Sequence, residues 1–173
     1  TIIYRRFNTP VGRLLAAVSP AGLCRLCFPG EESEGLFKWA AQKYPGADVE
    51  EGCSEVLNSV EKQLLEYFSG KRKHFSVTLD LKGTVFQRRV WHALMQIPFG
   101  STVSYKNVAH AVGSPAAVRA VGQANNRNPV PIIVPCHRVV GANGHLVGYG
   151  GGLDIKLRLL ELEGIKVRKD SII

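Results

Sequence analysis

The segment PVPIIVPCHRVVG, residues 129–141, places one cysteine at the exit of a short apolar run. Residues 131–134 are a proline followed by three β-branched side chains, and prolines bound the run on both sides. Such a segment suits a brief buried extended strand better than a helix, because proline lacks the N–H that a helix interior needs. We therefore expect Cys136 to lie where the core ends and a cleft begins.

Cys136 is followed directly by His137 and Arg138, and both residue types can activate a thiol. A cysteine is a nucleophile only as the thiolate, so it needs a base or a positive environment. Adjacent side chains of an extended backbone point to opposite faces, so we expect His137 to reach the sulfur through a water unless the chain turns. The alternative is a structural cysteine beside a core histidine, because free cysteine is usually inert and buried.

The positive charge of the chain is concentrated in the half that carries Cys136. The 173 residues have a formal net charge of +8. Residues 1–83 hold 11 Lys and Arg against 10 Asp and Glu, whereas residues 84–173 hold 11 against 4. This distribution favours a polyanionic partner for the second half. A hydrophobic share of 45% is that of an ordinary globular protein with one good core or two small ones.

Four cysteines in a chain of this length do not suggest a secreted disulfide framework. Cys24 and Cys27 form a CxxC pair inside a predicted strand, where positions three apart face opposite ways, and no second ligand pair follows. We therefore expect neither a metal nor a cofactor. No segment approaches the roughly 20 apolar residues that cross a bilayer, and no signal peptide is evident. We expect no membrane partner and a cytoplasmic protein, nucleoid-associated in a prokaryote or nuclear in a eukaryote.

The first half predicts an α+β domain over residues 1–82. Residues 2–7, 13–18 and 23–28 read as strands of an antiparallel meander, separated by proline- and glycine-containing turns. Residues 36–44 have the apolar spacing of a helix that ends at Pro45-Gly46, and Ser54 can cap a second helix that ends at Gly70. Residues 75–81 resemble a further strand. The charge balance changes at Lys82-Gly83, where we place the domain boundary.

Residues 83–173 predict a mostly helical second domain. Thr84 and Gln87 have the spacing of a capping box for a helix that ends at Pro98, and Trp91 is expected in its core. Ser104 can cap a short helix that ends near Val112, and Gly113 follows it. Ser114 and Pro115 are suited to start the next helix. This is helix-turn-helix spacing, although a plain helical hairpin has the same pattern.

The second helix of this pair has a face suited to DNA. Its inward positions are apolar: Ala117, Val118, Val121 and Ala124. Its outward positions are small or polar: Ala116, Arg119, Ala120 and Gln123. Small side chains let a helix approach a surface closely, whereas base readout calls for several long polar side chains. The face therefore indicates binding to shape and phosphates, and the lone Arg119 could enter the base stack from the minor groove.

The segment Pro135-Cys136-His137-Arg138-Val139, with residues 128–131 before it and 148–152 after it, resembles the O6-alkylguanine-DNA alkyltransferases. These are also called methylated-DNA–protein-cysteine methyltransferases, and the resemblance is dense over residues 83–164. It implies a ribonuclease H-like first domain and a monomeric DNA repair protein that acts on double-stranded DNA. The protein would flip O6-alkylguanine, or less well O4-alkylthymine, out of the duplex and transfer the alkyl group irreversibly to Cys136.

The resemblance also implies a role for individual residues. Cys136 is the nucleophile, His137 activates it through a water, Glu163 orients His137, and Tyr105 donates a proton to the departing O6. Arg119 fills the space that the flipped nucleotide leaves. The other implied DNA contacts are Ser104, Lys106, Ala120, Gln123 and Arg127. The implied substrate pocket is Asn128, which braces the turn before the cysteine, with Val139, Tyr149, Gly150 and Gly151, and the implied structural residue is Arg138.

The last helix is expected to start at Asp154 and to end at Gly164. Its predicted buried residues are Ile155, Leu159 and Leu162. Glu163 lies one turn from Leu159 and can face partly inward, although an exposed terminal glutamate fits the same pattern.

Two other classes of protein remain open. One is a non-catalytic DNA-binding protein, either a helix-turn-helix regulator or an alkyltransferase-like damage sensor, although such sensors lack the cysteine. The other is a cysteine hydrolase, which would turn over repeatedly. The number of groups transferred per protein separates these classes.

Overall fold

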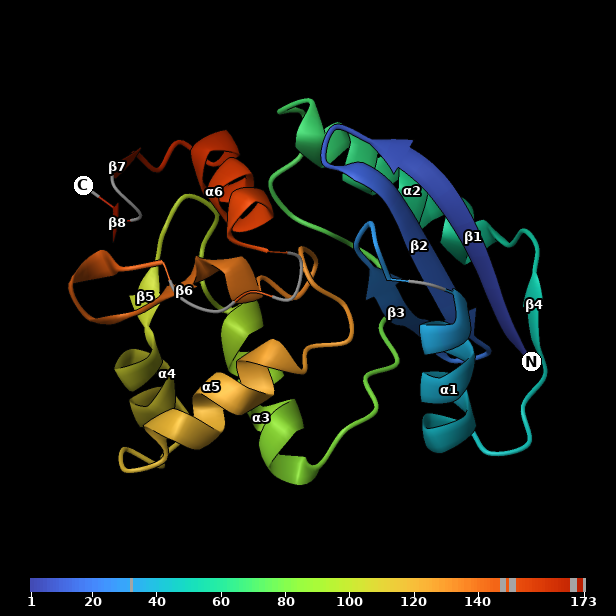
Figure 1. The fold of residues 1–173 in the computed structure, drawn as a ribbon, viewed down its shortest axis with the longest axis horizontal. Coiled ribbons are helices and arrows are strands. Elements are labelled where there is room, and N and C mark those ends of the chain that lie inside the picture. Colours follow the sequence, from blue (N-terminus) through green and yellow to red (C-terminus); the bar gives the residue numbers. More distant parts are fainter. Residues whose placement is uncertain (32, 147–148, 150–151, 169–170, 173) are drawn as a thin grey trace. The chain divides into compact units, whose positions relative to one another are not determined.

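The computed structural model describes residues 1–31, 33–146, 149, 152–168 and 171–172. The chain divides into two compact units, Thr1–Lys82 and Gly83–Ile173 (Figure 1). The first is built around a sheet and the second mainly from helices, so the α+β fold expected from the sequence is confirmed.

The sheet of the first unit is the expected antiparallel meander with one added strand. Strands β1 (Ile2–Thr9), β2 (Gly12–Ser19) and β3 (Gly22–Cys27) pair in sequence order. A short strand that the sequence did not reveal, β4 (Val49–Glu51), pairs in parallel with β1. The sheet order is therefore β3-β2-β1-β4.

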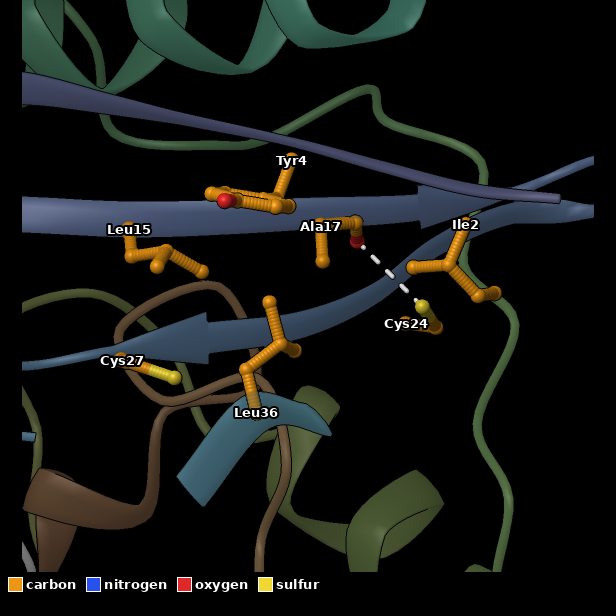
Figure 2. Close-up of a cluster of buried hydrophobic side chains, with 7 residues drawn as sticks. All are labelled: Ile2, Tyr4, Leu15, Ala17, Cys24, Cys27 and Leu36. Atoms are coloured by element: carbon orange, nitrogen blue, oxygen red, sulfur yellow. Dashed lines mark hydrogen bonds between the residues drawn. The ribbon is translucent and has the colours of Figure 1, made fainter. Parts of the chain in front are cut away.

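Two helices, α1 (Ser33–Lys43) and α2 (Glu55–Phe68), pack on this sheet. Residues 14–19 of β2 are all buried, and adjacent strand residues point to opposite faces, so both faces of the sheet are covered. Ser54 caps α2 as predicted and accepts a hydrogen bond from the Leu57 amide at 3.1 Å. Helix α2 contacts β1, β2 and β3. On α1, Leu36 packs into a buried cluster with β1–β3 side chains (Figure 2).

The predicted strand over residues 75–81 is not formed. Only Leu79 makes an isolated bridge, with Leu23 of β3. On either side of this bridge the Leu23 amide donates to the Thr78 carbonyl and the Asp80 amide donates to the Leu23 carbonyl, each at 2.8 Å. The Ser76 amide donates to the Gln63 side chain on α2 at 2.9 Å, so only the end of the segment pairs with the sheet.

The two cysteines of the CxxC pair point into the same core, so the expectation that they face opposite ways is wrong. A β-bulge shifts the register between β2 and β3 at Ala17 and Val18, and this extra residue brings Cys24 and Cys27 into one cluster (Figure 2). Both are free thiols. Burial raises the pKa of each to about 12, so neither is a nucleophile near neutral pH. Within the described residues, no cluster of three potential metal ligands is found.

The second unit is organised by four helices, α3 (Val85–Met95), α4 (Tyr105–Ala111), α5 (Val118–Asn126) and α6 (Leu153–Leu162). The predicted capping box at the start of α3 is present, because the side chains of Thr84 and Gln87 each bind the other residue's backbone amide. Trp91 is buried as expected. Its Nε1–H donates to the Ala124 carbonyl at 2.8 Å, which fastens α3 to α5.

The start of α5 differs from the prediction. The Ser114 amide donates to the Ala109 carbonyl, and the Ser114 carbonyl closes a turn with the Ala117 amide, so the helix begins at Val118 instead of near Pro115. Val118 was expected to face the core, but at this first helical position it is 38% exposed. Val121 and Ala124 are buried, as predicted.

Short pairings that no sequence pattern revealed complete the second unit. Strand β5 (Val103–Ser104) pairs in parallel with β6 (Val139–Val140), and β7 (Val167–Arg168) pairs with β8 (Ser171–Ile172). Strand β5 leads directly into α4, and β6 directly follows the 3₁₀ turn η1 (Cys136–Arg138). The β5–β6 pairing therefore brings the first residue of α4 next to the cysteine turn. Among the described residues, no helix is long and apolar enough to cross a membrane.

Candidate active site

The run before the cysteine is buried as expected, but it forms a tight turn rather than an extended strand. The Val134 amide donates to the Val130 carbonyl at 3.0 Å, and Ile132 has φ of 73°. Positive φ is rare and strained for a β-branched residue, and such strain is found mostly at functional sites. The extended prediction failed because prolines deprive this run of the N–H groups that a strand ladder needs.

Asn128 bridges the turn from both sides. Its Nδ2 donates to the Val134 carbonyl at 2.7 Å, and its Oδ1 accepts from the Val130 amide at 2.9 Å. These are the contacts that a bracing residue must make. They fix the backbone two residues before Cys136.

Replacing Asn128 with alanine is expected to lower the free energy of unfolding by about 2–4 kcal/mol, because two buried backbone groups lose their partners at once. Urea denaturation of the purified protein measures the change. Asn126→Ala is the matched control, since Asn126 is exposed on α5 and a change there is expected to stay within about 0.5 kcal/mol. Equal stability of the two variants would show that the turn holds without its brace.

Cys136 begins the 3₁₀ turn and lies deeper than predicted. It is only 3% exposed and His137 is fully buried, so the sulfur lies within the core rather than at its edge. The Arg138 amide donates to the Pro135 carbonyl at 3.0 Å, which curls the chain over these residues. The expectation of an extended backbone at His137 is therefore wrong.

One carboxylate, that of Glu163, binds both residues that follow the cysteine. Its Oε2 is 2.7 Å from His137 Nε2, and Arg138 donates Nε to Oε1 at 2.9 Å and Nη2 to Oε2 at 3.1 Å. The Gly100 amide also donates to Oε1 at 3.0 Å. Burial works against the charge, but these hydrogen bonds lower the pKa of Glu163 to about 2. The carboxylate is ionised at neutral pH.

This arrangement fixes the tautomer of His137. Burial lowers the pKa of the imidazole, so the ring is neutral at pH 7. An ionised carboxylate can only accept, so Nε2 carries the hydrogen and Nδ1 carries the lone pair. Nδ1 is buried and has no hydrogen-bond partner in the part of the chain that the structure describes. The ring can therefore act as a base through Nδ1.

A buried lysine on α6 supplies positive charge to the cysteine. Lys156 is fully buried and its Nζ donates to the Val139 carbonyl at 2.7 Å. Burial lowers the pKa of Lys156 to about 8, although the nearby charge of Cys136 raises it. Burial likewise raises the pKa of the Cys136 thiol, and the side chains of Asn128, Lys156 and Tyr149 counteract that rise. The sulfur therefore needs a base to become a thiolate at neutral pH.

Tyr105, the first residue of α4, lies next to the cysteine turn through the β5–β6 pairing. Burial and then the charge of Cys136 raise the pKa of its phenol, and a hydrogen bond with Asn125 lowers it. Tyr105 is half-buried. A phenol in this position keeps its proton at neutral pH and can donate it.

The predicted DNA-contacting side chains are mostly at the surface. Lys106, Arg119, Gln123 and Arg127 are exposed and Ala120 is half-buried. The Ser104 hydroxyl is engaged within the molecule, because it accepts from the Asn107 amide at 3.0 Å and donates to Asn107 Oδ1 at 2.8 Å.

The predicted pocket residues differ in how far the structure describes them. Val139 is fully buried in β6 and offers only its carbonyl, which binds Lys156. Tyr149 is half-buried. Gly150 and Gly151 lie outside the described residues.

Two buried residues near Cys136 were not predicted from the sequence. Asn125 follows the buried Val121 by four positions on α5, and Lys156 precedes the buried Leu159 by three on α6. Helical spacing alone could have placed both on inward faces. On α6 the predicted Ile155 and Leu162 are only half-buried, because the helix turns Lys156 and Leu160 inward instead.

Comparison with known proteins is consistent across both units. Residues 2–81 match the family model described as "6-O-methylguanine DNA methyltransferase, ribonuclease-like domain", and residues 85–165 match "6-O-methylguanine DNA methyltransferase, DNA binding domain". The constitutive methylated-DNA–protein-cysteine methyltransferase of Bacillus subtilis is 45% identical over 96% of this chain and 98% of its own length. The methylated-DNA–protein-cysteine methyltransferase of Methanosarcina acetivorans is 47% identical over 93% of this chain and 97% of its own.

Solved structures agree with the sequence relatives. The crystal structure of Mycobacterium tuberculosis OGT in complex with DNA has a TM-score of 0.80 at 42% identity, covering 93% of this chain and 92% of that one. The crystal structure of Mycobacterium tuberculosis O6-methylguanine methyltransferase gives 0.80 at 43% identity, covering 94% and 93%. Because both units match the family models and the relatives align over nearly the whole chain, the chain belongs to the 6-O-methylguanine DNA methyltransferase family.

Proposed function

We propose that this chain is a DNA repair protein that removes the alkyl group from O6-alkylguanine in duplex DNA and keeps it on Cys136. The observation that carries this proposal is the site itself. A buried thiol shares a turn with a neutral imidazole whose Nε2 is held by Glu163 and whose Nδ1 has no partner among the described residues. The names of the relatives above support the same activity.

The reaction uses five side chains. A water passes the Cys136 thiol proton to His137 Nδ1, and Glu163 and Lys156 steady the charges that result. The thiolate attacks the alkyl carbon, the new S–C bond forms as the C–O6 bond breaks, and the electron pair leaves with guanine. Tyr105 gives its proton to the departing base, so guanine leaves neutral. His137 then gives up its extra proton to solvent, and Tyr105 regains its proton from solvent.

The product explains why the protein acts once. A thioether has no leaving group that water can displace, so Cys136 stays alkylated and each chain removes one group. The base must come to this sulfur, because O6 lies inside the duplex and a buried thiol cannot reach it.

The helix pair α4–α5 holds the DNA in this proposal. Arg119, Gln123, Arg127 and Lys106 face solvent and contact phosphates, and Arg119 enters the stack where the damaged nucleotide has left. A relative from Mycobacterium tuberculosis was crystallised with DNA. We also propose that the chain acts as a monomer, that O4-alkylthymine is a poorer substrate, and that residues 1–82 support the second domain.

Counting transferred groups tests the proposal. Incubation with excess methylated duplex oligonucleotide is expected to add one methyl mass to each protein, located on the Cys136 peptide, and to add none to Cys136→Ala. Cys53→Ser is the matched control, because Cys53 is the exposed cysteine and its loss should change nothing. Repeated turnover would indicate a cysteine hydrolase, and tight binding without transfer would indicate a damage sensor or regulator.

A further inference from the structure

Asn125 lies on the inner face of α5, beside Tyr105 and the backbone of the cysteine turn. A Cβ atom on Gly122 would lie 3.9 Å from the Tyr105 ring, so this ring packs against α5 at that point. Asn125 follows Gly122 by three residues and so lies on the same face of the helix. It is 2% exposed, and its Nδ2 is 3.5 Å from the Cys136 carbonyl, to which it donates.

The amide of Asn125 also has a polar contact with Tyr105. It forms a hydrogen bond with Tyr105 that favours the ionised phenol and so lowers its pKa. One side chain thus links the first residue of α4 to the backbone of the cysteine turn.

Packing does not account for an amide at this position. Asn125 Oδ1 is buried and has no hydrogen-bond partner within the described residues. An unsatisfied buried acceptor costs about 1–3 kcal/mol, and leucine would fill a similar volume without that cost. The donor side of the amide must therefore supply the reason for its presence.

We infer that Asn125 is a positioning residue for alkyl transfer. Its Nδ2–H groups bind both the Tyr105 oxygen and the Cys136 carbonyl, and so hold Tyr105 with its proton directed at the departing base. The inference rests on the proposed function. When Tyr105 gives up this proton, its oxygen becomes negative, and a hydrogen bond to a charged oxygen is about twice as strong as a neutral one. Asn125 therefore assists most at the moment of transfer, and it acts through Tyr105.

A double-mutant cycle tests this coupling. Single-turnover methyl transfer is measured at saturating methylated duplex for the wild type, Asn125→Leu, Tyr105→Phe and the double variant. Asn125→Leu is expected to slow transfer roughly tenfold to a hundredfold, the range for a hydrogen bond to a charged group. In the Tyr105→Phe background the same change is expected to slow it less than threefold. Equal losses in both backgrounds, or no loss in Asn125→Leu alone, would overturn the inference.

A second readout needs no transfer at all. Titration of Tyr105, followed by NMR of ring-labelled tyrosine, is expected to show a higher phenol pKa in Asn125→Leu and in the smaller variant Asn125→Ala. An unchanged pKa would contradict the contact even if both variants are slow. Asn126→Ala, on the same helix but exposed, is the matched control for folding and rate. Absence of transfer by the wild type, with the pKa difference intact, would reject the proposed function while leaving the Asn125–Tyr105 contact established.

Discussion

Replacing Glu163 with alanine is expected to lower the free energy of unfolding of the second unit by about 3–5 kcal/mol and to reduce alkyl transfer at least a hundredfold. The change leaves the Arg138 guanidinium buried without its carboxylate, and removing one partner of a buried ion pair costs this much. It also frees His137 Nε2, so the tautomer that leaves Nδ1 as the base is no longer fixed. Urea denaturation and single-turnover kinetics measure the two effects separately.

Glu161→Ala is the matched control, because Glu161 is exposed two residues earlier on α6. Acid provides a further check. The pKa of Glu163 is about 2 in the folded protein against 4.5 for the free side chain, so its stabilisation is complete above pH 4.5 and is lost as the pH falls towards 2. The Glu163→Ala variant should not show this loss of stability between pH 4.5 and pH 2. If it matched Glu161→Ala in stability, the carboxylate would not hold this turn together.

Replacing Arg119 with alanine is expected to slow transfer from methylated duplex DNA about a hundredfold while leaving transfer from free O6-benzylguanine unchanged. Arg119 is exposed on α5, so its loss disturbs no core contact. Without a side chain to fill the vacated position, the duplex keeps its stacked state, and rotating a base out costs a few kcal/mol. Rates with the two substrates, measured on the same protein sample, separate base extrusion from chemistry.

Two further variants sharpen this experiment. Arg119→Lys keeps the charge but not the flat guanidinium, so it should restore most of the DNA affinity and only part of the rate. Arg158→Ala removes an exposed cation from α6 and should leave the rate with both substrates unchanged. Equal losses of Arg119→Ala on duplex and free base would argue against a role in base displacement.

The first residue of a helix was predictable wherever the capping residue and its partner lie close together in the sequence. Thr84 with Gln87 and Ser54 with Leu57 act within one turn, so the sequence alone contains both partners. The prediction at Ser114 was wrong because its amide closes the end of the preceding helix on the Ala109 carbonyl, and residues 114–117 form a further turn before α5 begins. Pairings of two residues, such as β5 with β6, leave no periodic pattern to detect.

The site residues were named from the motif around Cys136, but their arrangement was not predictable. The 3₁₀ turn at Cys136 and the positive φ of Ile132 lie in a segment that contains three prolines and is held by the two hydrogen bonds of Asn128. Lys156 was missed because a charged residue on a helix is usually solvated. Its burial is compensated by the Val139 carbonyl, which belongs to a strand the sequence did not reveal.

The depth of Cys136 has a consequence for a protein that can be used only once. At 3% exposure and with a thiol whose pKa is raised by burial, this sulfur is shielded from oxidants that would consume it without repairing anything. Such reagents meet the exposed Cys53 first. Burial of Cys136 thus preserves the thiol for the one reaction that it can perform.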